Sequence, residues 1–404
     1  MTSPKLRFKE FREEWKLYKL KDKACFLAGY AFDSNKMDSK EGKYQLLKMS
    51  NVYQNQLDLT RNPSYWNDID KGYDRWLLER GDIVLTLTGT VGKKDYGYSI
   101  EVPESNKFLL NQRLVRLRQI DGESLSKFIK YRISTDRFFY HFFNISKGGT
   151  GNQSNVSIED LKLIEVNFPS IDEQIKIANF LTAVDEKISQ LNEQHQLMIQ
   201  YKKGVMQKIF SQEIRFKDDD GEEFGEWEER ILEDVSIIIM GSSPKSENYN
   251  ELGIGLPLLQ GNADIKNRKS CPRNFTTEIT KECYVGDILM SVRAPVGYVA
   301  KAMHDACIGR GIAAIRVKEN NNQEFLYQYL IYMEDIWGRF SQGSTFDSVN
   351  SEQIKKLSLF IPCLQEQTKI ADFLTKLDDK IEKLALQLEQ VKTWKKGLLQ
   401  QMFV

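Results

Sequence analysis

The pattern of apolar positions is most regular in two stretches of the chain, residues 171–210 and 364–403. Within each stretch, apolar residues recur at alternating spacings of four and three, which places them on one stripe of an α-helix. Forty residues of helix reach roughly 60 Å. The positions predicted to form a helix–helix seam are Ile177, Leu181, Val184, Ile188, Leu191, Met198, Ile370, Leu374, Leu377, Ile381, Leu384, Leu388 and Val391.

These two stretches are copies of one another. They start 193 residues apart, align without a gap and share 18 of 40 positions, including E-Q-x-K-I-A-x-F-L-T near the start and K-K-G near the end. Pro169-Ser170 and Pro362-Cys363 precede the copies, and Ser170 with Glu173 predicts a capping box. We therefore expect two long helices that begin at equivalent points of a duplicated chain.

The order of the segments predicts how the helices pair. The first helix leads from one globular region to the other, and the second follows the second region with an apolar stripe of its own. Antiparallel packing buries both stripes, holds the two regions apart and relates them by a pseudo-two-fold axis. It also predicts that Phe403 ends near Leu6–Phe8, since Phe210 is followed closely by the similar Ile214–Phe216.

The duplication continues into the globular regions. Gly81-Asp-Ile-Val-Leu85 returns as Gly286-Asp-Ile-Leu-Met290, and Thr88-Gly-Thr-Val-Gly92 aligns with Arg293-Ala-Pro-Val-Gly297. Short β-rich runs among turns, each region ending in an aromatic helical stretch (Leu125–Phe143 and Glu324–Phe340), predict mixed α and β structure. The fold class expected is α+β: two mixed domains (residues 1–170 and 214–363) joined and spaced by two antiparallel coiled-coil helices (171–213 and 364–404).

Composition and charge modify this picture only slightly. The length of 404 residues suits two domains and a spacer. The formal net charge is zero, but residues 213–234 hold eleven acids and three bases, so the remainder of the chain is mildly basic. No apolar run reaches the length of a membrane span, the start does not read as a signal peptide, and five scattered cysteines suit reduced thiols in the cytoplasm.

Signatures of catalysis are largely missing from the sequence. It has no phosphate-binding loop of the G-x-x-x-x-G-K-[ST] type and no dinucleotide fingerprint. Asn62-Pro-Ser-Tyr65 lacks the second proline of an adenine-methylase motif and is interpreted as a turn, and Asp33 with Glu41-Gly-Lys43 as a solvated loop rather than a nuclease site. Three histidines without Cys-x-x-Cys make a zinc site improbable. A non-catalytic protein without a metal is expected.

The repeated motifs, taken together, carry a family resemblance. The P-x-[IL]-x-E-Q-x-K-I-A-x-F-L entry to each helix, the G-D-I-[VL] run, the V-G loop, Asn111-Gln-Arg and Gly309-Arg-Gly occur in order in a duplicated chain. Over essentially its whole length the chain resembles the specificity subunits of bacterial type I restriction-modification systems. The resemblance implies that each globular half reads one half of a split double-stranded DNA target, and that the helices set the gap and dock two modification subunits.

It also implies the division of labour between subunits. The modification subunits would methylate adenine with S-adenosylmethionine, and restriction subunits would cleave DNA with ATP and Mg²⁺, so no cofactor is expected on this chain. A roughly 60 Å spacer matches one and a half to two turns of B-DNA at about 34 Å per turn.

Individual DNA contacts are assigned from side-chain chemistry on the loops. Asn and Gln suit adenine, Arg suits guanine, and Lys suits phosphate. The residues predicted to contact DNA are Thr88, Thr90, Lys93, Lys94, Arg113, Lys147, Asn152 and Gln153 in the first half, and Gln260, Asn262, Lys266, Arg268, Lys269, Arg293, Arg310, Ser344 and Thr345 in the second. For each, a solvated loop residue or a backbone cap is the alternative.

Two further interpretations stay open. The Lys202-Lys203-Gly204 and Lys395-Lys396-Gly397 runs are expected to contact DNA phosphates or a partner subunit, because both copies keep them, and solvated helix ends near a glycine are the alternative. The alternative function is a stand-alone DNA-binding regulator that dimerises through its helical rod, and an unrecognised nuclease or methylase is a third class.

Overall fold

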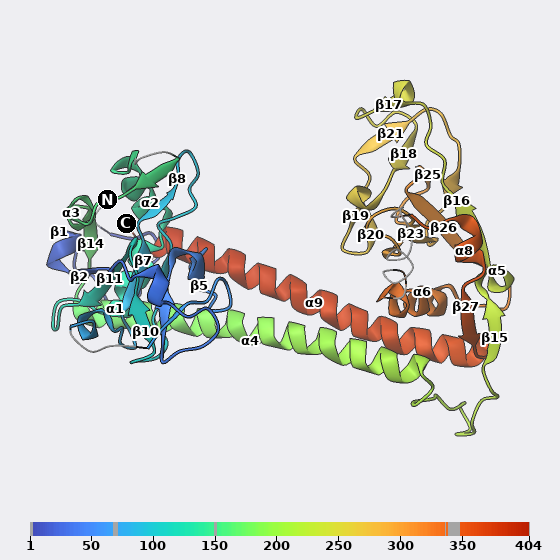
Figure 1. Ribbon diagram of the computed structural model, residues 1–404, viewed down its shortest axis with the longest axis horizontal. Coiled ribbons are helices and arrows are strands. Elements are labelled where there is room, and N and C mark those ends of the chain that lie inside the picture. The colour runs from blue at the N-terminus through green and yellow to red at the C-terminus, as the bar shows by residue number, and fades with distance from the viewer. Residues whose placement is uncertain (1–2, 68–71, 149–151, 336, 338–347, 404) are drawn as a thin grey trace. The chain divides into compact units, whose positions relative to one another are not determined.

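The computed structural model divides into two compact units, which are described separately (Figure 1). Unit 1 comprises Met1–Leu191 with Gln387–Val404, and unit 2 comprises Asn192–Leu386. The structure describes all residues except 1–2, 68–71, 149–151, 336, 338–347 and 404. Each unit therefore takes a part of both long helices, whereas the sequence assigned those helices to segments of their own.

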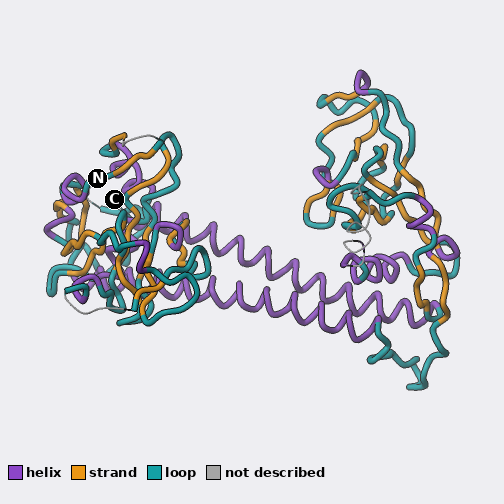
Figure 2. Tube along the Cα trace, viewed as in Figure 1, coloured by secondary structure: helices purple, strands orange, loops and turns teal. Residues whose placement is uncertain are grey.

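Unit 1 is a mixed α/β domain (Figure 2). Its helices are α1 Ser126–Ile133, α2 Asp136–Asn144, α3 Ile158–Lys162, the first part of α4 Ile171–Phe210 and the last part of α9 Leu364–Met402. Its strands are β1 Lys16–Lys19, β2 Ala24–Ala28, β3 Tyr44–Leu47, β4 Val52–Tyr53, β5 Gln56–Leu57, β6 Tyr65–Trp66, β7 Ile83–Thr86, β8 Thr88–Thr90, β9 Ser99–Glu101, β10 Phe108–Leu110, β11 Leu114–Gln119, β12 Lys147–Gly148, β13 Gln153–Asn155 and β14 Glu165–Phe168.

A central sheet with strand order β2-β11-β7-β9 organises unit 1. Successive residues of a strand face opposite sides of a sheet. Ile83 and Leu85 accordingly pack into a core shared with α1, α2 and both long helices, while Val84 packs on the other side. The second face is covered by the sheet β10-β3-β6 and the hairpin β4–β5. Because both faces of the sheet are buried, β7 has consecutive apolar residues rather than an alternation of apolar and polar ones.

Unit 2 repeats this plan. Its helices are the last part of α4, α5 Leu232–Val235, α6 Gln323–Tyr332, α8 Ser351–Lys355 and the first part of α9. Its strands are β15 Glu228–Ile231, β16 Ser236–Met240, β17 Tyr249–Asn250, β18 Leu256–Leu259, β19 Ile265–Lys266, β20 Lys269–Ser270, β21 Asn274–Thr276, β22 Glu282–Cys283, β23 Ile288–Ser291, β24 Val299–Lys301, β25 Ala306–Ile308, β26 Ile312–Val317 and β27 Ser358–Ile361.

The main sheet of unit 2 has the order β16-β26-β23-β24-β20-β19, beside a second sheet β17-β21-β18-β25-β22. Ile288 and Met290 face the core formed with α6 and the long helices, and Leu289 faces the opposite core. The alternation of inward and outward residues is thus the same as in β7 of unit 1. The expected mixture of α and β structure in two similar domains is confirmed.

The long helices α4 and α9 have the residue bounds that the heptad pattern predicts, apart from one residue at the end of α9. In unit 1 the start of α4 packs with the end of α9, where Lys395 pairs with Asp185 at 2.5 Å. In unit 2 the end of α4 packs with the start of α9, where Lys202 pairs with Asp378 at 2.6 Å. The helices are therefore antiparallel within each unit, and all thirteen predicted seam residues are buried or half-buried.

These ion pairs correct the interpretation of the K-K-G runs. Lys202 is 8% exposed, and its ammonium donates to both carboxylate oxygens of Asp378. Burial lowers the pKa of Lys202, and Asp378 opposes that shift. The first lysine of each run was kept because it joins the two helices, which is a contact within the chain rather than with phosphate.

The repeated E-Q motif at each helix start also has a structural role. In unit 1 the carboxylate of Glu173, 1% exposed, accepts two hydrogen bonds from Arg7 at 2.8 Å and one from Trp15 Nε1 at 3.2 Å. Glu366 of unit 2 accepts the same bonds from Arg215 and Trp227. The glutamate ties each domain to its helix, so the predicted capping-box role of Glu173 is wrong.

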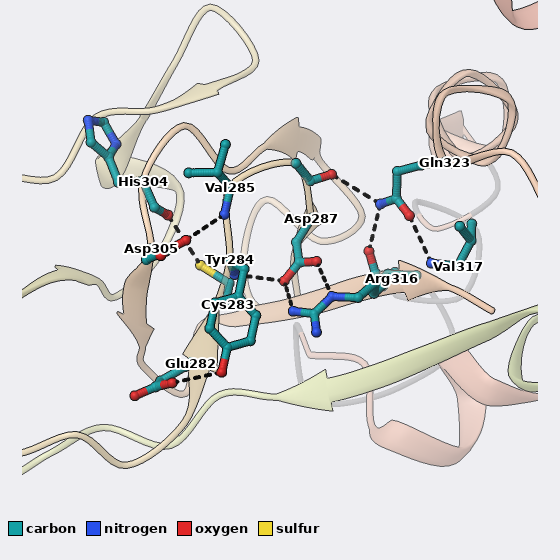
Figure 3. A network of polar contacts seen from close by, with 12 residues as sticks. Glu282, Cys283, Tyr284, Val285, Asp287, His304, Asp305, Arg316, Val317 and Gln323 are labelled. Carbon is teal, nitrogen blue, oxygen red and sulfur yellow. Dashed lines mark hydrogen bonds and ion pairs between the residues drawn. The ribbon is translucent and has the colours of Figure 1, made fainter. Parts of the chain in front are cut away.

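The aspartate of each G-D-I run is a buried ion-pair partner. In unit 2, Figure 3 shows Asp287 facing Arg316, which donates to both carboxylate oxygens at 2.7 Å. The hydrogen bond to Asp287 raises the pKa of Arg316 above its ordinary value. Asp82 and Arg118 form the equivalent pair in unit 1, at 2.6 and 2.8 Å. The repeat therefore preserves the scaffold of the domain at this point.

Two other predictions are tested in unit 1. The N–H of Leu6 donates to the carbonyl of Gln401 at 2.9 Å, and Phe403 lies in the core with Trp15, so the predicted meeting of the two chain ends is confirmed. The aromatic stretch Leu125–Phe143 is not one helix, because the side chain of Thr135 caps a new helix by accepting from Phe138 N.

Candidate nucleic-acid interface

Two loops of unit 1 that the sequence selected lie side by side. Strand β8 pairs with β13, so Thr90 faces Gln153 and Thr88 faces Asn155. Thr88 Oγ1 donates to Asn155 Oδ1 at 2.9 Å, and Val156 N donates to Leu87 O at 2.9 Å. Residues more than sixty positions apart thereby form one polar edge.

Arg113 extends this edge. A cavity of about 450 Å³ is lined by Thr88, Arg113, Gln153 and Asn155, together with Gly29 and Leu114. Arg113 follows β10 in a tight turn and has the left-handed φ of 68°, which is uncommon for a residue other than glycine. Its exposed guanidinium makes no hydrogen bond or ion pair with any residue that the structure describes. An unpaired guanidinium beside amide and hydroxyl groups is suited to hydrogen bonding with the edge of a base pair.

The Thr88–Gly92 loop is fixed from within. Asp95 accepts hydrogen bonds from Thr90 N at 2.8 Å and from Thr90 Oγ1 at 2.7 Å. Burial raises the pKa of Asp95, but these bonds outweigh it and keep the pKa below its ordinary value. Thr90 is therefore occupied in holding the loop, and Lys93 and Lys94 lie exposed at its tip.

Unit 2 contains the same pairing. Arg293 forms a bridge with Ser348, and Val349 N donates to Val292 O at 3.0 Å. By the internal repeat, Arg293, Ser348, Val349 and Val292 correspond to Thr88, Asn155, Val156 and Leu87 of unit 1. Arg293 is exposed and, like Arg113, has no side-chain partner among the described residues.

Arg310 lies on a second loop of unit 2. Its N–H donates to Ser243 Oγ at 3.2 Å, and its side chain is exposed. Gly311 lies so close to Gln260 that an added Cβ would come within 2.2 Å of the Gln260 carbonyl. Glycine is thus required for Gln260 and Arg310 to share this part of the surface.

Several predicted contacts are already engaged inside the protein. Arg268 donates to Glu334 at 2.6 and 2.9 Å and to Val299 O, Lys269 pairs with Glu382 at 2.7 Å, and Lys147 pairs with Asp160 at 3.0 Å. Such pairs would have to be exchanged for a phosphate. Asn262 has a buried Oδ1, whereas Lys266 and Asn152 are exposed. Ser344 and Thr345 lie outside the described residues.

Sequence reasoning missed three side chains near this interface. Asn155 ends the loop whose Asn152 and Gln153 were chosen, and its pairing with Thr88 is not visible in the sequence. Lys48 and Arg61 line a second cavity together with Arg113. Neither belongs to a repeated motif, so no signal in one sequence marks them.

Among the residues that the structure describes, no group of three or more His, Cys, Asp or Glu side chains could hold a metal ion. In the same part of the chain, no helix is both long and apolar enough to cross a membrane.

Comparison with known proteins decides the family. The model of the type I restriction modification DNA specificity domain matches twice, over residues 12–200 and 225–393. The chain belongs to this type I specificity family. The double match also reproduces the duplication that the sequence shows, one copy for each recognition domain with part of its spacer helix.

Named relatives agree with this assignment. The chain is 30% identical to a putative type I restriction enzyme MjaX specificity subunit from Methanocaldococcus jannaschii, over 96% of this chain and 93% of that protein. It is 31% identical over 191 residues to the MjaIX specificity subunit of the same organism, covering 43% of each.

Solved structures of the family share the fold. A type I restriction-modification S subunit from M. genitalium superposes with a TM-score of 0.64 at 18% identity, covering 100% of this chain and 99% of that one. A chain from a type I R-M complex gives 0.58 at 21% identity, over 95% and 96%. The predicted architecture of two recognition domains with long spacer helices is confirmed.

Membership also settles the type of activity. A type I specificity subunit confers DNA target specificity and is not the catalytic subunit, so the main functional prediction is confirmed over the stand-alone regulator. Its binding partners are therefore DNA and other proteins of the restriction-modification complex.

Proposed function

We propose that this type I specificity subunit reads an asymmetric, bipartite DNA target, with unit 1 recognising one half-site and unit 2 the other. One observation supports this most directly: both units carry the same loop pairing, Thr88 with Asn155 and Arg293 with Ser348, but with different side chains. An identical scaffold with different polar side chains suits two domains that recognise different base sequences.

The residues of each reading surface differ in their roles. In unit 1, Arg113, Gln153 and Asn155 face base edges, while Lys93, Lys94 and Asn152 contact the sugar-phosphate backbone. In unit 2, Arg293, Arg310 and Gln260 face base edges, and Lys266 contacts phosphate. Arg268, Lys269 and Lys147 are secondary contacts, because each already pairs with a carboxylate.

The chemistry belongs to the partner subunits. Two modification subunits dock on the spacer helices and methylate adenine in each half-site with S-adenosylmethionine. Restriction subunits join the same assembly and use ATP and Mg²⁺ to cleave unmodified DNA. This chain binds no cofactor of its own and acts in the cytoplasm, where the DNA of the host lies.

A map of methylated adenines in the host genome, made with and without this gene, tests the proposal. The expected result is the loss of one split motif, two short words around a fixed gap, when the gene is deleted. If the complex is expressed and the map does not change, or if the lost motif is a single continuous word, the proposal is wrong. A matched strain with Arg137→Ala, an exposed α2 residue away from both cavities, should keep the map of the wild type.

A further inference from the structure

A second concave site lies in unit 1, beside the reading surface. Its volume is about 560 Å³, and its lining includes three cationic side chains, Lys48, Arg61 and Arg113. Arg113 is shared with the cavity that holds Thr88 and Gln153, so the two cavities are neighbours. Neither Lys48 nor Arg61 has a role in the function proposed above.

The charge of this cavity is not balanced by its own walls. Among the described residues that line the cavity, Asp95 is the one acid, and Thr90 N and Oγ1 already donate to it. Lys48 donates to Ser64 Oγ, a neutral hydroxyl, and Arg113 has no partner in the described part of the chain. A cavity lined by three cations and one carboxylate that is already hydrogen-bonded favours an anion.

Arg61 packs on an aromatic ring, and its charge also acts on the nearby carboxylate of Asp58. Its guanidinium lies over the ring of Tyr53, 5.8 Å from the ring centroid. The side chain of Asn51, fully buried, donates to the Arg61 carbonyl at 2.8 Å and to the Asp58 carbonyl at 2.9 Å. Stacking on an aromatic ring leaves the five N–H donors of an arginine free. The backbone contacts then present those donors at the rim of the cavity.

The hairpin that carries Tyr53 is rigid as well. Strands β4 and β5 are joined by Gln54 and Asn55, both left-handed with φ of 50° and 59°, as a two-residue hairpin turn requires. Asn55 Oδ1 accepts from Ser99 N at 2.9 Å, which fixes the turn against the central sheet. A site on such a hairpin needs little ordering when a ligand binds.

The corresponding hairpin of unit 2, β19–β20, has two of its cations paired with acids. Asn267 and Arg268 form its turn with φ of 50° and 58°. Two of its three cations pair with acids, Arg268 with Glu334 and Lys269 with Glu382, while Lys266 is exposed. Arg61 beside the unit 1 hairpin, by contrast, forms no ion pair within the described part of the chain.

We propose that the cavity of Lys48, Tyr53, Arg61 and Arg113 is an anion site that holds one phosphodiester group of the bound duplex. Arg61 binds its oxygens with the guanidinium fork, and Lys48 adds a second positive charge. Tyr53 is a positioning residue for Arg61. The inference rests on the proposed function, because the phosphate is supplied by the DNA that unit 1 reads.

The salt dependence of binding tests this assignment. The complex of the full chain with its modification subunits is titrated with a duplex carrying the mapped motif, at several salt concentrations. Arg61→Ala is expected to weaken binding about tenfold, the effect of one charge-assisted hydrogen-bonded contact. The slope of log K against log salt should become shallower by about 0.9 for one lost phosphate. Both changes should be equal on a scrambled duplex, since a phosphate contact carries no sequence information.

Matched variants make the result specific. Arg61→Lys should recover most of the slope, Tyr53→Leu should lose part of the affinity and Tyr53→Phe should not. Arg137→Ala removes an equally exposed arginine of unit 1 that does not line the cavity, and should change neither affinity nor slope. Replacing single phosphates of the duplex by neutral methylphosphonates should reveal one position that weakens the wild type but has no effect on Arg61→Ala.

Other outcomes overturn the inference. An unchanged affinity and slope for Arg61→Ala would remove the phosphate site while leaving the proposed function intact. A loss confined to the target duplex, with the slope unchanged, would make Arg61 a base contact instead. Saturable binding of inorganic phosphate, lost in Arg61→Ala without any effect on DNA, would make the cavity a free-anion site. A wild-type complex that binds no duplex at all would refute the proposed function itself.

Discussion

Lys395 and Asp185 form an ion pair between α9 and α4 in unit 1, and Lys202 and Asp378 form its duplicate in unit 2. Each lysine and each aspartate is the copy, 193 residues away, of the corresponding residue in the other pair. The duplicated helices therefore share a duplicated ion pair. In each unit, the aspartate of that pair also accepts a hydrogen bond from a side chain of the recognition domain. Tyr131 Oη donates to Asp185 at 2.8 Å, and Gln328 Nε2 donates to Asp378 at 2.8 Å.

The two members of the unit 2 pair should not contribute equally to stability. Asp378→Asn leaves the buried Lys202 ammonium without its carboxylate and is expected to cost about 3 kcal/mol of unfolding free energy, while Lys202→Met is expected to cost about 1 kcal/mol or less. Urea unfolding of the full chain, followed by helix circular dichroism, measures both. Lys203→Met, an exposed neighbour, is the control and should stay within about 0.5 kcal/mol. Equal losses for Asp378→Asn and Lys202→Met would contradict this account.

Phe210 is the last residue of α4 and Phe403 directly follows α9, and the two offer a matched pair of core variants. Phe403 packs in unit 1 with Trp15 and Phe128, and Phe210 packs in unit 2 with Phe325 and Tyr329. Phenylalanine to alanine at either buried site should cost about 3 kcal/mol. Hydrogen exchange should report Phe403→Ala as faster exchange in unit 1 alone, and Phe210→Ala in unit 2 alone. Faster exchange spread evenly over both units would argue against two separate cores.

The Thr90–Asp95 contact predicts a pH dependence. Because the folded pKa of Asp95 is below that of an unfolded aspartate, near 3.9, the contact contributes fully above that value and is lost as pH falls through the folded pKa. Thr90→Val should therefore reduce the unfolding free energy by about 1 kcal/mol at pH 7. The difference from wild type should disappear in acid. NMR titration should show a higher Asp95 pKa in the variant, and an unchanged pKa would refute the contact.

Substitution of the free arginines should alter one half-site at a time. Arg113→Ala should relax the methylated motif only in the word read by unit 1, and Arg310→Ala only in the word read by unit 2. One lost bidentate base contact corresponds to about 10- to 100-fold in discrimination. Methylation maps of the two strains provide the comparison. A change in both words from either variant would show that the arginine supports the fold rather than reads a base.

The sequence predicted the long helices closely because three signals agree there: the heptad, the proline before each helix, and the duplication. Such features depend on local pattern, which one sequence contains in full.

The roles of the repeated polar residues could not be predicted in the same way. Glu173 meets Arg7 across 166 positions, and Asp82 meets Arg118 across 36, so nothing near either acid in the sequence indicates its partner. A lysine kept in both copies is as consistent with phosphate binding as with a helix–helix ion pair. For the same reason Arg61 was overlooked, since its importance depends on a cavity assembled from five separate segments.

Unit 1 is built from two separate segments of the chain, and this affects the order in which the two units can fold during synthesis. Unit 2 is one continuous segment, Asn192–Leu386, and can complete its core as soon as it has been synthesised. Unit 1 begins first but needs Leu398, Met402 and Phe403 to close its core. The domain translated first therefore completes its core last. During synthesis, part of its apolar surface stays exposed until the end of α9 has been made. A polypeptide that stops within α9 would keep a complete unit 2 and an open unit 1.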